Sequence, residues 1–323
     1  MTSQTIGFSV SCFRGDLPLA RATLSSIRAF ASDAPISLIV DGDCCPTRAL
    51  EKTYGVTVIR KGDVKNRDLR KWSFGYGLTK MIALWEAPFD IIFHVDADAI
   101  LWGDIRENLP SGSWDIVYNE PHEVITEQVQ LAQYFDPDLI FKYIEPFQWK
   151  NNQYFNGGAF CVRKGILDLD EYMRLLEIQR NHPGVISSGE QGHLGILVFR
   201  AVQEGSIIAK RACLQALIPM IPKDDLEKRF RIVNGTPIVD GMPAIIHWAG
   251  EKPWRENKEI FRAPMDYFRE RALRECGVPG QLPIGIVTHV DEFVSRRWPI
   301  IAVDTKRRVK SLLGMKGSSV RKS

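Results

Sequence analysis

The chain has 323 residues, of which 45% are hydrophobic and 25% charged, the composition of an ordinary globular protein. No apolar run approaches the roughly 20 residues that a bilayer-spanning helix needs, and the N-terminal segment has no signal-peptide pattern. From Phe293 onward nine basic residues accompany one acid, which leaves the first 292 residues with a net charge of −5 out of +3 overall. An acidic body with a basic tail argues against a nucleic-acid partner.

Strands and helices alternate through the first part of the chain. We predict buried strands at 6–11, 36–40, 56–59 and 91–95, helices at 17–30, 47–54 and 77–85, and a charged loop at 61–71. Such alternation is typical of right-handed βαβ units around a mostly parallel sheet with helices on its faces. Ligands of such sheets lie at the carboxyl ends of the strands.

The second part of the chain is less regular. The pattern predicts strands at 114–118, 155–162 and 244–247, short strands or turns at 213–221 and 232–239, and helices at 167–180 and 190–202. Residues 119–150 are acidic, aromatic and interrupted by prolines, so we interpret them as an irregular segment that could serve as an acceptor surface. Beyond Trp254 the pattern is helical and charged. We therefore predict a catalytic domain at 1–260 and a helical, basic extension at 261–323.

Two aspartates end the strand at 91–95. Side chains alternate along a strand, so Asp96 and Asp98 are expected to point to the same side. Paired carboxylates next to an apolar run repel each other, and a divalent cation would remove that cost. Hard oxygen ligands suit Mg²⁺ or Mn²⁺, which connect protein carboxylates with substrate phosphates.

Four stretches of the chain together carry a family resemblance. They are Asp96-Ala-Asp98, Asn156-Gly157-Gly158, Glu190-Gln191-Gly192, and the segment from His247 through Gly250 and Lys252 to Trp254. In this order they resemble the retaining family 8 glycosyltransferases, which include glycogenin and bacterial lipopolysaccharide galactosyltransferases and have the GT-A fold. The resemblance covers residues 6–254, and one residue fewer than is common in the family separates Gly250 from Lys252.

The resemblance implies a metal-dependent hexosyltransferase with a UDP-sugar donor and a glycan or lipid-linked glycan acceptor. Asp96, Asp98 and His247 would bind the metal, and the histidine nitrogen favours Mn²⁺ over Mg²⁺. The metal would act as a Lewis acid on the leaving diphosphate, and Lys252 would add a fixed positive charge there. Gly250 precedes this lysine in the family's order.

The remaining residues implied by the resemblance would hold the sugar and the nucleoside. Asn156 and Glu190 would bind sugar hydroxyls, Gly157 and Gly158 would let the backbone approach the sugar, and Gln191 would lie beneath the anomeric carbon. Three further residues are assigned to the donor side. Lys80 would pair with Glu190 or a sugar oxygen, Phe13 would stack on uracil, and Asp41 would contact the ribose or base.

Two alternatives remain open at this point. A nucleotidyltransferase would also pair two aspartates with a metal and a nucleotide, but it predicts a phosphate loop rich in glycine and basic residues after the first strand. Residues 12–16 contain one glycine and one arginine. A non-catalytic UDP-sugar-binding protein could have the same fold.

The basic tail suggests attachment to a surface. Cations alternate with apolar residues around Trp298, and residues 304–315 could form a short amphipathic helix. A segment of this kind lies on an anionic membrane surface without crossing it. We therefore expect a cytoplasmic protein that associates peripherally with the inner face of the membrane.

Overall fold

The computed structural model describes residues 4–42, 45–75, 77–120, 133–149, 156–187, 189–218, 220–279 and 282–297. Within these ranges a central seven-stranded sheet has the order β3-β2-β1-β4-β7-β6-β8. Its strands are β1 (Ile6–Phe13), β2 (Ile36–Asp41), β3 (Thr57–Arg60), β4 (Ile91–Asp96), β6 (Ile116–Asn119), β7 (Ala159–Arg163) and β8 (Ala209–Ala212). The predicted α/β class with a mostly parallel sheet is confirmed.

The strand that carries the first aspartate lies at the centre of this sheet. β4 pairs in parallel with β1, and its other neighbour, β7, is antiparallel. β1 also pairs in parallel with β2, and β2 with β3. The carboxyl ends of β1, β2 and β4 therefore meet at one edge of the sheet, where Phe13, Asp41 and Asp96 end their strands.

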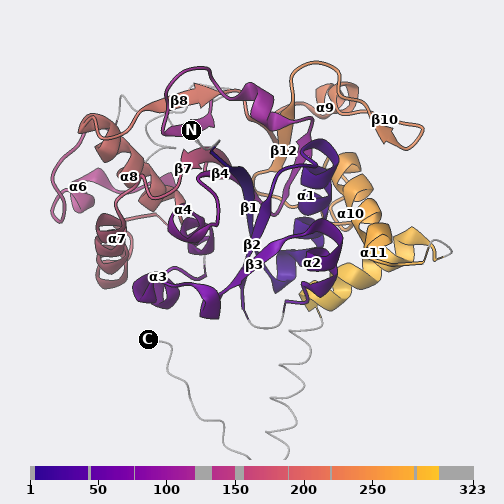
Figure 1. The fold of residues 1–323 in the computed structure, drawn as a ribbon, viewed down its shortest axis with the longest axis horizontal. Helices are drawn as coiled ribbons and strands as arrows, with labels where there is room; N and C mark the ends of the chain where they lie inside the picture. The colour runs from indigo at the N-terminus through magenta and orange to yellow at the C-terminus, as the bar shows by residue number, and fades with distance from the viewer. Residues whose placement is uncertain are drawn as a thin grey trace, which may run out of the picture.

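Helices cover both faces of the sheet (Figure 1). On one side lie α1 (Leu17–Phe30), α2 (Arg48–Tyr54), α10 (Ala263–Glu275) and α11 (Ile284–Glu292). On the other side lie α3 (Arg67–Trp72), α4 (Ala83–Glu86), α6 (Pro137–Ile140), α7 (Leu169–Asn181) and α8 (Gln191–Gln203). Short 3-10 helices are η1 (Arg14–Asp16), η2 (Lys61–Asp63), η3 (Leu78–Ile82) and η4 (Ile105–Asn108), and a π-helical turn, η5 (Phe293–Arg297), follows α11.

A second, smaller sheet continues directly from β4. It has the order β5-β12-β9, formed by β5 (Ala99–Trp102), β12 (Ala244–Trp248) and β9 (Gln215–Ile218). β10 (Ile232–Val233) and β11 (Thr236–Pro237) form a hairpin beside α9 (Lys223–Arg229). The strand alternation predicted for Asp96 and Asp98 therefore does not extend to Asp98. Asp98 lies in the two-residue turn between β4 and β5, at the junction of the two sheets.

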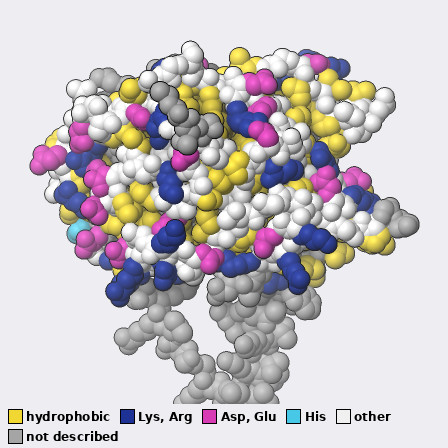
Figure 2. Space-filling view, viewed as in Figure 1, with side chains coloured by type: hydrophobic (Ala, Val, Ile, Leu, Met, Phe, Trp, Pro, Cys, Tyr) yellow, Lys and Arg dark blue, Asp and Glu magenta, His cyan; other side chains and the backbone are white. Residues whose placement is uncertain are grey.

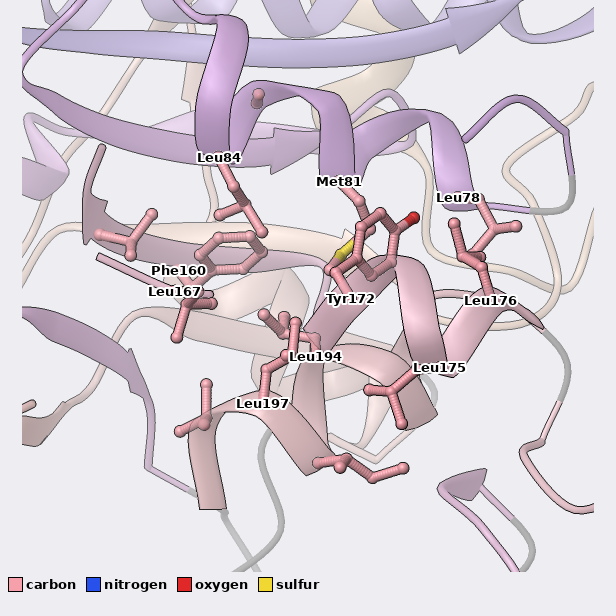
Figure 3. Packing of buried hydrophobic residues seen from close by; sticks show 14 of the residues in the cluster. Leu78, Met81, Leu84, Phe160, Leu167, Tyr172, Leu175, Leu176, Leu194 and Leu197 are labelled. Carbon is pink, nitrogen blue, oxygen red and sulfur yellow. The ribbon is translucent and has the colours of Figure 1, made fainter. Parts of the chain in front are cut away.

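Apolar side chains fill the space between sheet and helices. Figure 3 shows Leu78 and Met81 of η3 and Leu84 of α4 facing Tyr172 of α7 and Leu194 of α8. On the opposite face Phe8 and Phe93 stack with ring centroids 5.3 Å apart, within a cluster that includes α1. Basic and acidic side chains are interspersed on the surface shown in Figure 2.

Two local predictions are corrected by the structure. Residues 61–71 are not a loop: the Asn66 side chain accepts hydrogen bonds from the Asp68 and Leu69 N–H groups and begins α3. Residues 77–85 form a 3-10 helix followed by one α-turn rather than one continuous helix. Outside the described ranges lie residues 121–132, which belong to the segment predicted to be irregular, and the tail beyond residue 297.

Four described aromatic residues of the segment 119–150 belong to the core. Tyr134, Phe135, Phe147 and Trp149 are buried, and Phe135 makes edge contacts with both Phe147 and Trp149. These side chains therefore do not form the acceptor surface that the sequence suggested for this segment. Among the described helices, none is both long enough and apolar enough to cross a membrane.

Candidate active site

Two adjacent cavities open at the carboxyl ends of β1, β2 and β4. The first, of about 480 Å³, is lined by Phe13, Asp16, Asp41 and Thr79. The second, of about 380 Å³, is lined by Asn156, Gln191, Met220 and His247. Both cavities share three lining residues, which are Asp96, Glu190 and Lys252. The carboxylates predicted to bind the metal thus lie between two compartments.

The structure brings Asp96, Asp98 and His247 together. Their nearest ligand atoms all lie within 4.8 Å of one another. His247 reaches the group because β12 pairs antiparallel with β5, which places His247 opposite Ala99 and lets the Trp248 N–H donate to the Asp98 carbonyl at 3.2 Å. His247 Nε2 lies 3.8 Å from Asp96 Oδ2 and 3.7 Å from Asp98 Oδ1. These gaps exceed hydrogen-bond lengths.

This donor set fits a divalent cation. Two carboxylates and one imidazole nitrogen converge from the end of β4, from the turn after it and from β12 of the smaller sheet; Asp98 and His247 are buried, and the Asp96 side chain is 21% exposed. Five acids and two lysines line the first cavity among the described residues, so its walls carry an excess of negative charge. Mn²⁺ accepts this combination of oxygen and nitrogen ligands, and it would neutralise part of that excess.

Two lysines also neutralise these carboxylates. Lys80 is buried with its Nζ 2.7 Å from Asp96 Oδ1 and 2.7 Å from Glu190 Oε1. Burial alone would lower the pKa of Lys80, but Asp96 and Glu190 outweigh it and raise this pKa above its usual range. Lys252 Nζ forms an ion pair with Asp98 Oδ2. Lys252 therefore reaches the site despite its shorter spacing from Gly250.

The acid–base state of the metal-site residues follows from these neighbours. Burial would raise the pKa of Asp96, but the adjacent Lys80 ammonium holds it well below the usual range. Burial lowers the pKa of His247 even though Asp98 and Asp96 oppose that effect. Asp96 is therefore ionised and His247 neutral near pH 7, the states in which both can bind a cation.

The residues predicted to hold the sugar surround the second cavity. Gln191, the first residue of α8, accepts a hydrogen bond from the Gly157 N–H through Oε1 at 2.9 Å. Asn156 Oδ1 accepts from the Gly158 N–H at 2.7 Å. Both glycine N–H groups of the turn before β7 are therefore bound by side-chain oxygens. Position 158 requires glycine, because a Cβ there would lie 2.1 Å from His247 Cε1.

A second glycine leaves the space that the Glu190 carboxylate occupies. Gly77 has a φ of +84°, and a Cβ at this position would lie 2.3 Å from Glu190 Oε2. Glu190 is the residue before α8, and its carboxylate bonds Lys80 at the boundary between the two cavities. Gly250 also lines the second cavity, with a φ of +112°.

The first cavity holds the residues assigned to the nucleoside. Phe13 ends β1 with 51% of its surface exposed, and it pairs in register with Asp41 at the end of β2. Thr79 of η3 donates to Asp41 Oδ2 at 3.2 Å and thereby fixes this carboxylate at the rim of the cavity. An exposed aromatic ring beside a positioned acid is the arrangement expected around a base and a ribose.

Three further residues of this site were not predicted from the sequence. Asp16 lines the first cavity, and burial together with Asp98 raises its pKa to about 7. His94 is fully buried against Phe160 and its Nε2 lies 3.1 Å from Asp96 Oδ1. Gln215 bonds His247 Nδ1. Of the three, only His94 could have been predicted from the sequence, because it lies two residues before Asp96 and so points to the same side of β4.

Comparison with known proteins supports the fold. No family model matches the chain, and no curated protein gives a significant match. Two solved structures of LgtC are similar: an active-site mutant (TM-score 0.52, 12% identity) and the galactosyltransferase in complex with donor and acceptor sugar analogues (TM-score 0.51, 14% identity). Each alignment covers 86% of this chain and 97% of LgtC.

The apo structure of the bifunctional glycosyltransferase WbbM is similar over 90% of this chain and 52% of its own, with a TM-score of 0.53 and 12% identity. At these identities the likeness concerns the fold. The chain therefore has the GT-A fold that these glycosyltransferases share.

Proposed function

We propose that this protein is a metal-dependent, retaining glycosyltransferase that transfers a hexose from a UDP-sugar to a glycan or lipid-linked glycan. The observation that carries the proposal is the convergence of Asp96, Asp98 and His247 between two cavities at the carboxyl edge of a GT-A sheet. The first cavity suits a nucleoside diphosphate, and the second suits a transferred sugar and its acceptor. The complex of LgtC with donor and acceptor analogues supports this division on the shared fold.

The metal site would be formed by Asp96, Asp98 and His247, and bound Mn²⁺ would supply Lewis-acid stabilisation of the diphosphate charge. Lys252 would supply the second positive charge. In the structure its ammonium pairs with Asp98 at the wall shared by both cavities, so a short movement would bring it to a phosphate. Phe13 and Asp41 would hold the base and the ribose at the outer end of the first cavity.

Glu190, Asn156 and the two glycines of the β7 entry turn would position the sugar. Lys80 fixes Glu190 through a buried ion pair, and its Nζ also donates to the Gly157 carbonyl at 3.3 Å. Buried groups held in this way keep their geometry without reorganisation when the substrate binds. We infer that this cluster selects among hexoses through contacts with their hydroxyls.

Gln191 would lie beneath the anomeric carbon. An amide is a poor nucleophile, and its Oε1 already accepts from the Gly157 N–H. We therefore favour substitution on one face of the sugar over a covalent glycosyl-enzyme. The bond from the anomeric carbon to the diphosphate breaks, the acceptor hydroxyl oxygen forms the new bond on the same face, and its proton passes to the leaving phosphate.

The acceptor would be a glycan, including one attached to a lipid. In the described part of the C-terminal extension, α11 and η5 expose Ile286 (63%), Val290 (51%) and Val294 (44%), and the basic tail follows. These residues recur every four positions and so share one helix face. This apolar face, followed in the sequence by clustered cations, supports peripheral association with an anionic membrane surface, where such an acceptor would reside.

A donor screen tests the proposed function. The full chain is incubated with Mn²⁺ and UDP-glucose, UDP-galactose or their N-acetyl forms, and release of UDP is measured with and without glycan acceptors. We expect metal-dependent release from one hexose donor that increases with a suitable acceptor. Binding of UDP with no turnover on any donor would instead indicate a non-catalytic binding protein.

A further inference from the structure

Behind the metal-site histidine lies a buried glutamine. Gln215, at the start of β9, is 1% exposed, and His247, in the adjacent strand β12, is 4% exposed. Gln215 Oε1 and His247 Nδ1 lie 2.7 Å apart. The contact is short and shielded from water, so the chemical identity of the two atoms determines which ring nitrogen carries the proton.

The orientation of the glutamine amide is fixed by its other contacts. Gln215 Nε2 lies 3.4 Å from the Asn156 carbonyl oxygen and 3.3 Å from the Ala159 carbonyl oxygen. Carbonyl oxygens can only accept hydrogen bonds, so the group that faces them must be the NH₂ of the amide. Oε1 must then face the imidazole, and because it too can only accept, His247 Nδ1 must carry the hydrogen.

The glutamine itself is held in place from its backbone. Asn119 Oδ1 accepts from the Gln215 N–H at 2.7 Å and from the Leu214 N–H at 2.9 Å. On the other side of the ring, the absence of a side chain at Gly158 makes room for His247. The amide and the imidazole therefore have little freedom to exchange partners.

We propose that Gln215 is a positioning residue that fixes His247 in the Nδ1–H tautomer and so presents the Nε2 lone pair to the metal between Asp96 and Asp98. Nε2 is the ring nitrogen that faces both carboxylates, at 3.8 and 3.7 Å. This inference rests on the proposed metal site. Groups that orient a metal-binding histidine in this way typically change metal affinity 10- to 100-fold when removed.

Two substitutions separate this role from a purely structural one. Gln215→Met has a similar size and removes every amide hydrogen bond. Gln215→Glu loses the NH₂ donor to both carbonyls but keeps an oxygen that accepts from Nδ1–H. Gln179→Met is the matched control. The Gln179 side chain also donates to a backbone carbonyl, that of Ser187, at 3.5 Å, but it lines neither cavity.

The tautomer is read in the metal-free protein from ¹⁵N–¹H correlation spectra of the His247 ring, assigned with His247→Asn. Mn²⁺ affinity is measured separately by calorimetry. We expect an unprotonated Nε2 in the wild type, a mixture of tautomers in Gln215→Met, and about 10- to 100-fold weaker Mn²⁺ binding in that variant. Gln215→Glu should retain the wild-type tautomer and most of the affinity, and the Gln179→Met control should match the wild type.

A proton on Nε2 in the wild type would overturn the inference. This measurement is made on the wild type and does not depend on whether a variant folds. Equal Mn²⁺ affinity for the wild type and Gln215→Met would also overturn it, as would equal losses in Gln215→Met and Gln215→Glu. A wild-type protein with the Nδ1–H tautomer that binds no Mn²⁺ would support the tautomer assignment and refute the proposed metal-dependent function instead.

Discussion

Asp16 is expected to destabilise the metal-free protein above neutral pH. The structure raises its pKa from 3.8 to about 7, because its carboxylate is largely removed from water and lies near Asp98. An acid whose folded pKa is raised contributes stability below its unfolded pKa, and this contribution is lost as the pH rises through the folded pKa. At about 1.4 kcal/mol per pKa unit, the full difference is about 4 kcal/mol at pH 8.

The substitution Asp16→Asn removes this charge while keeping the size of the side chain. We expect the variant to be more stable than the wild type by about 2–4 kcal/mol at pH 8 and by only about 1 kcal/mol or less at pH 4.5. The assay is urea unfolding in chelator across this range, with the exposed Glu259→Gln as control. A difference between wild type and Asp16→Asn that does not change with pH would refute the reasoning.

Three further outcomes follow from the same geometry. Lys80→Met leaves two partly buried carboxylates without their cation, so urea unfolding should show a loss of about 3 kcal/mol that the exposed Lys52→Met does not show. NMR of the early product should show an α-linkage from an α-linked donor, and a β-linked product would contradict the retaining assignment. Full-length protein should sediment with anionic vesicles at low salt more than a chain ending at Arg297, and equal sedimentation would leave the tail without a membrane role.

Much of the fold could be predicted from the sequence because its strands are apolar runs with clear ends. The mostly parallel sheet follows from the alternation of strands and helices, and the helix predicted at 47–54 does end at Tyr54, before Gly55 in the left-handed conformation. The charge density of the segment 61–71 favours a loop, whereas the structure has the helix α3 there. This helix buries only Leu69, so the charged residues remain in solvent and the apolar period is too weak to detect.

The candidate site could be predicted where its residues stand in motifs at strand ends. Asp96, Asp98 and His247 do converge, although Asp98 does so from a turn rather than from the alternation of a strand. Gln215 could not be predicted, since it acts from a strand that is 32 residues away from His247 in the sequence and belongs to no motif. Asp16 matters because of its burial beside Asp98, which the sequence does not reveal.

The central claim is that Asp96, Asp98 and His247 bind a divalent cation that holds the diphosphate of the donor. Calorimetric titration of UDP into the wild type and into Asp98→Ala, each with Mn²⁺ and with chelator, tests it most directly. We expect UDP binding only by the wild type with Mn²⁺, because the acidic cavity repels a diphosphate without a cation. UDP binding of equal strength in chelator, or by Asp98→Ala with Mn²⁺, would contradict the account.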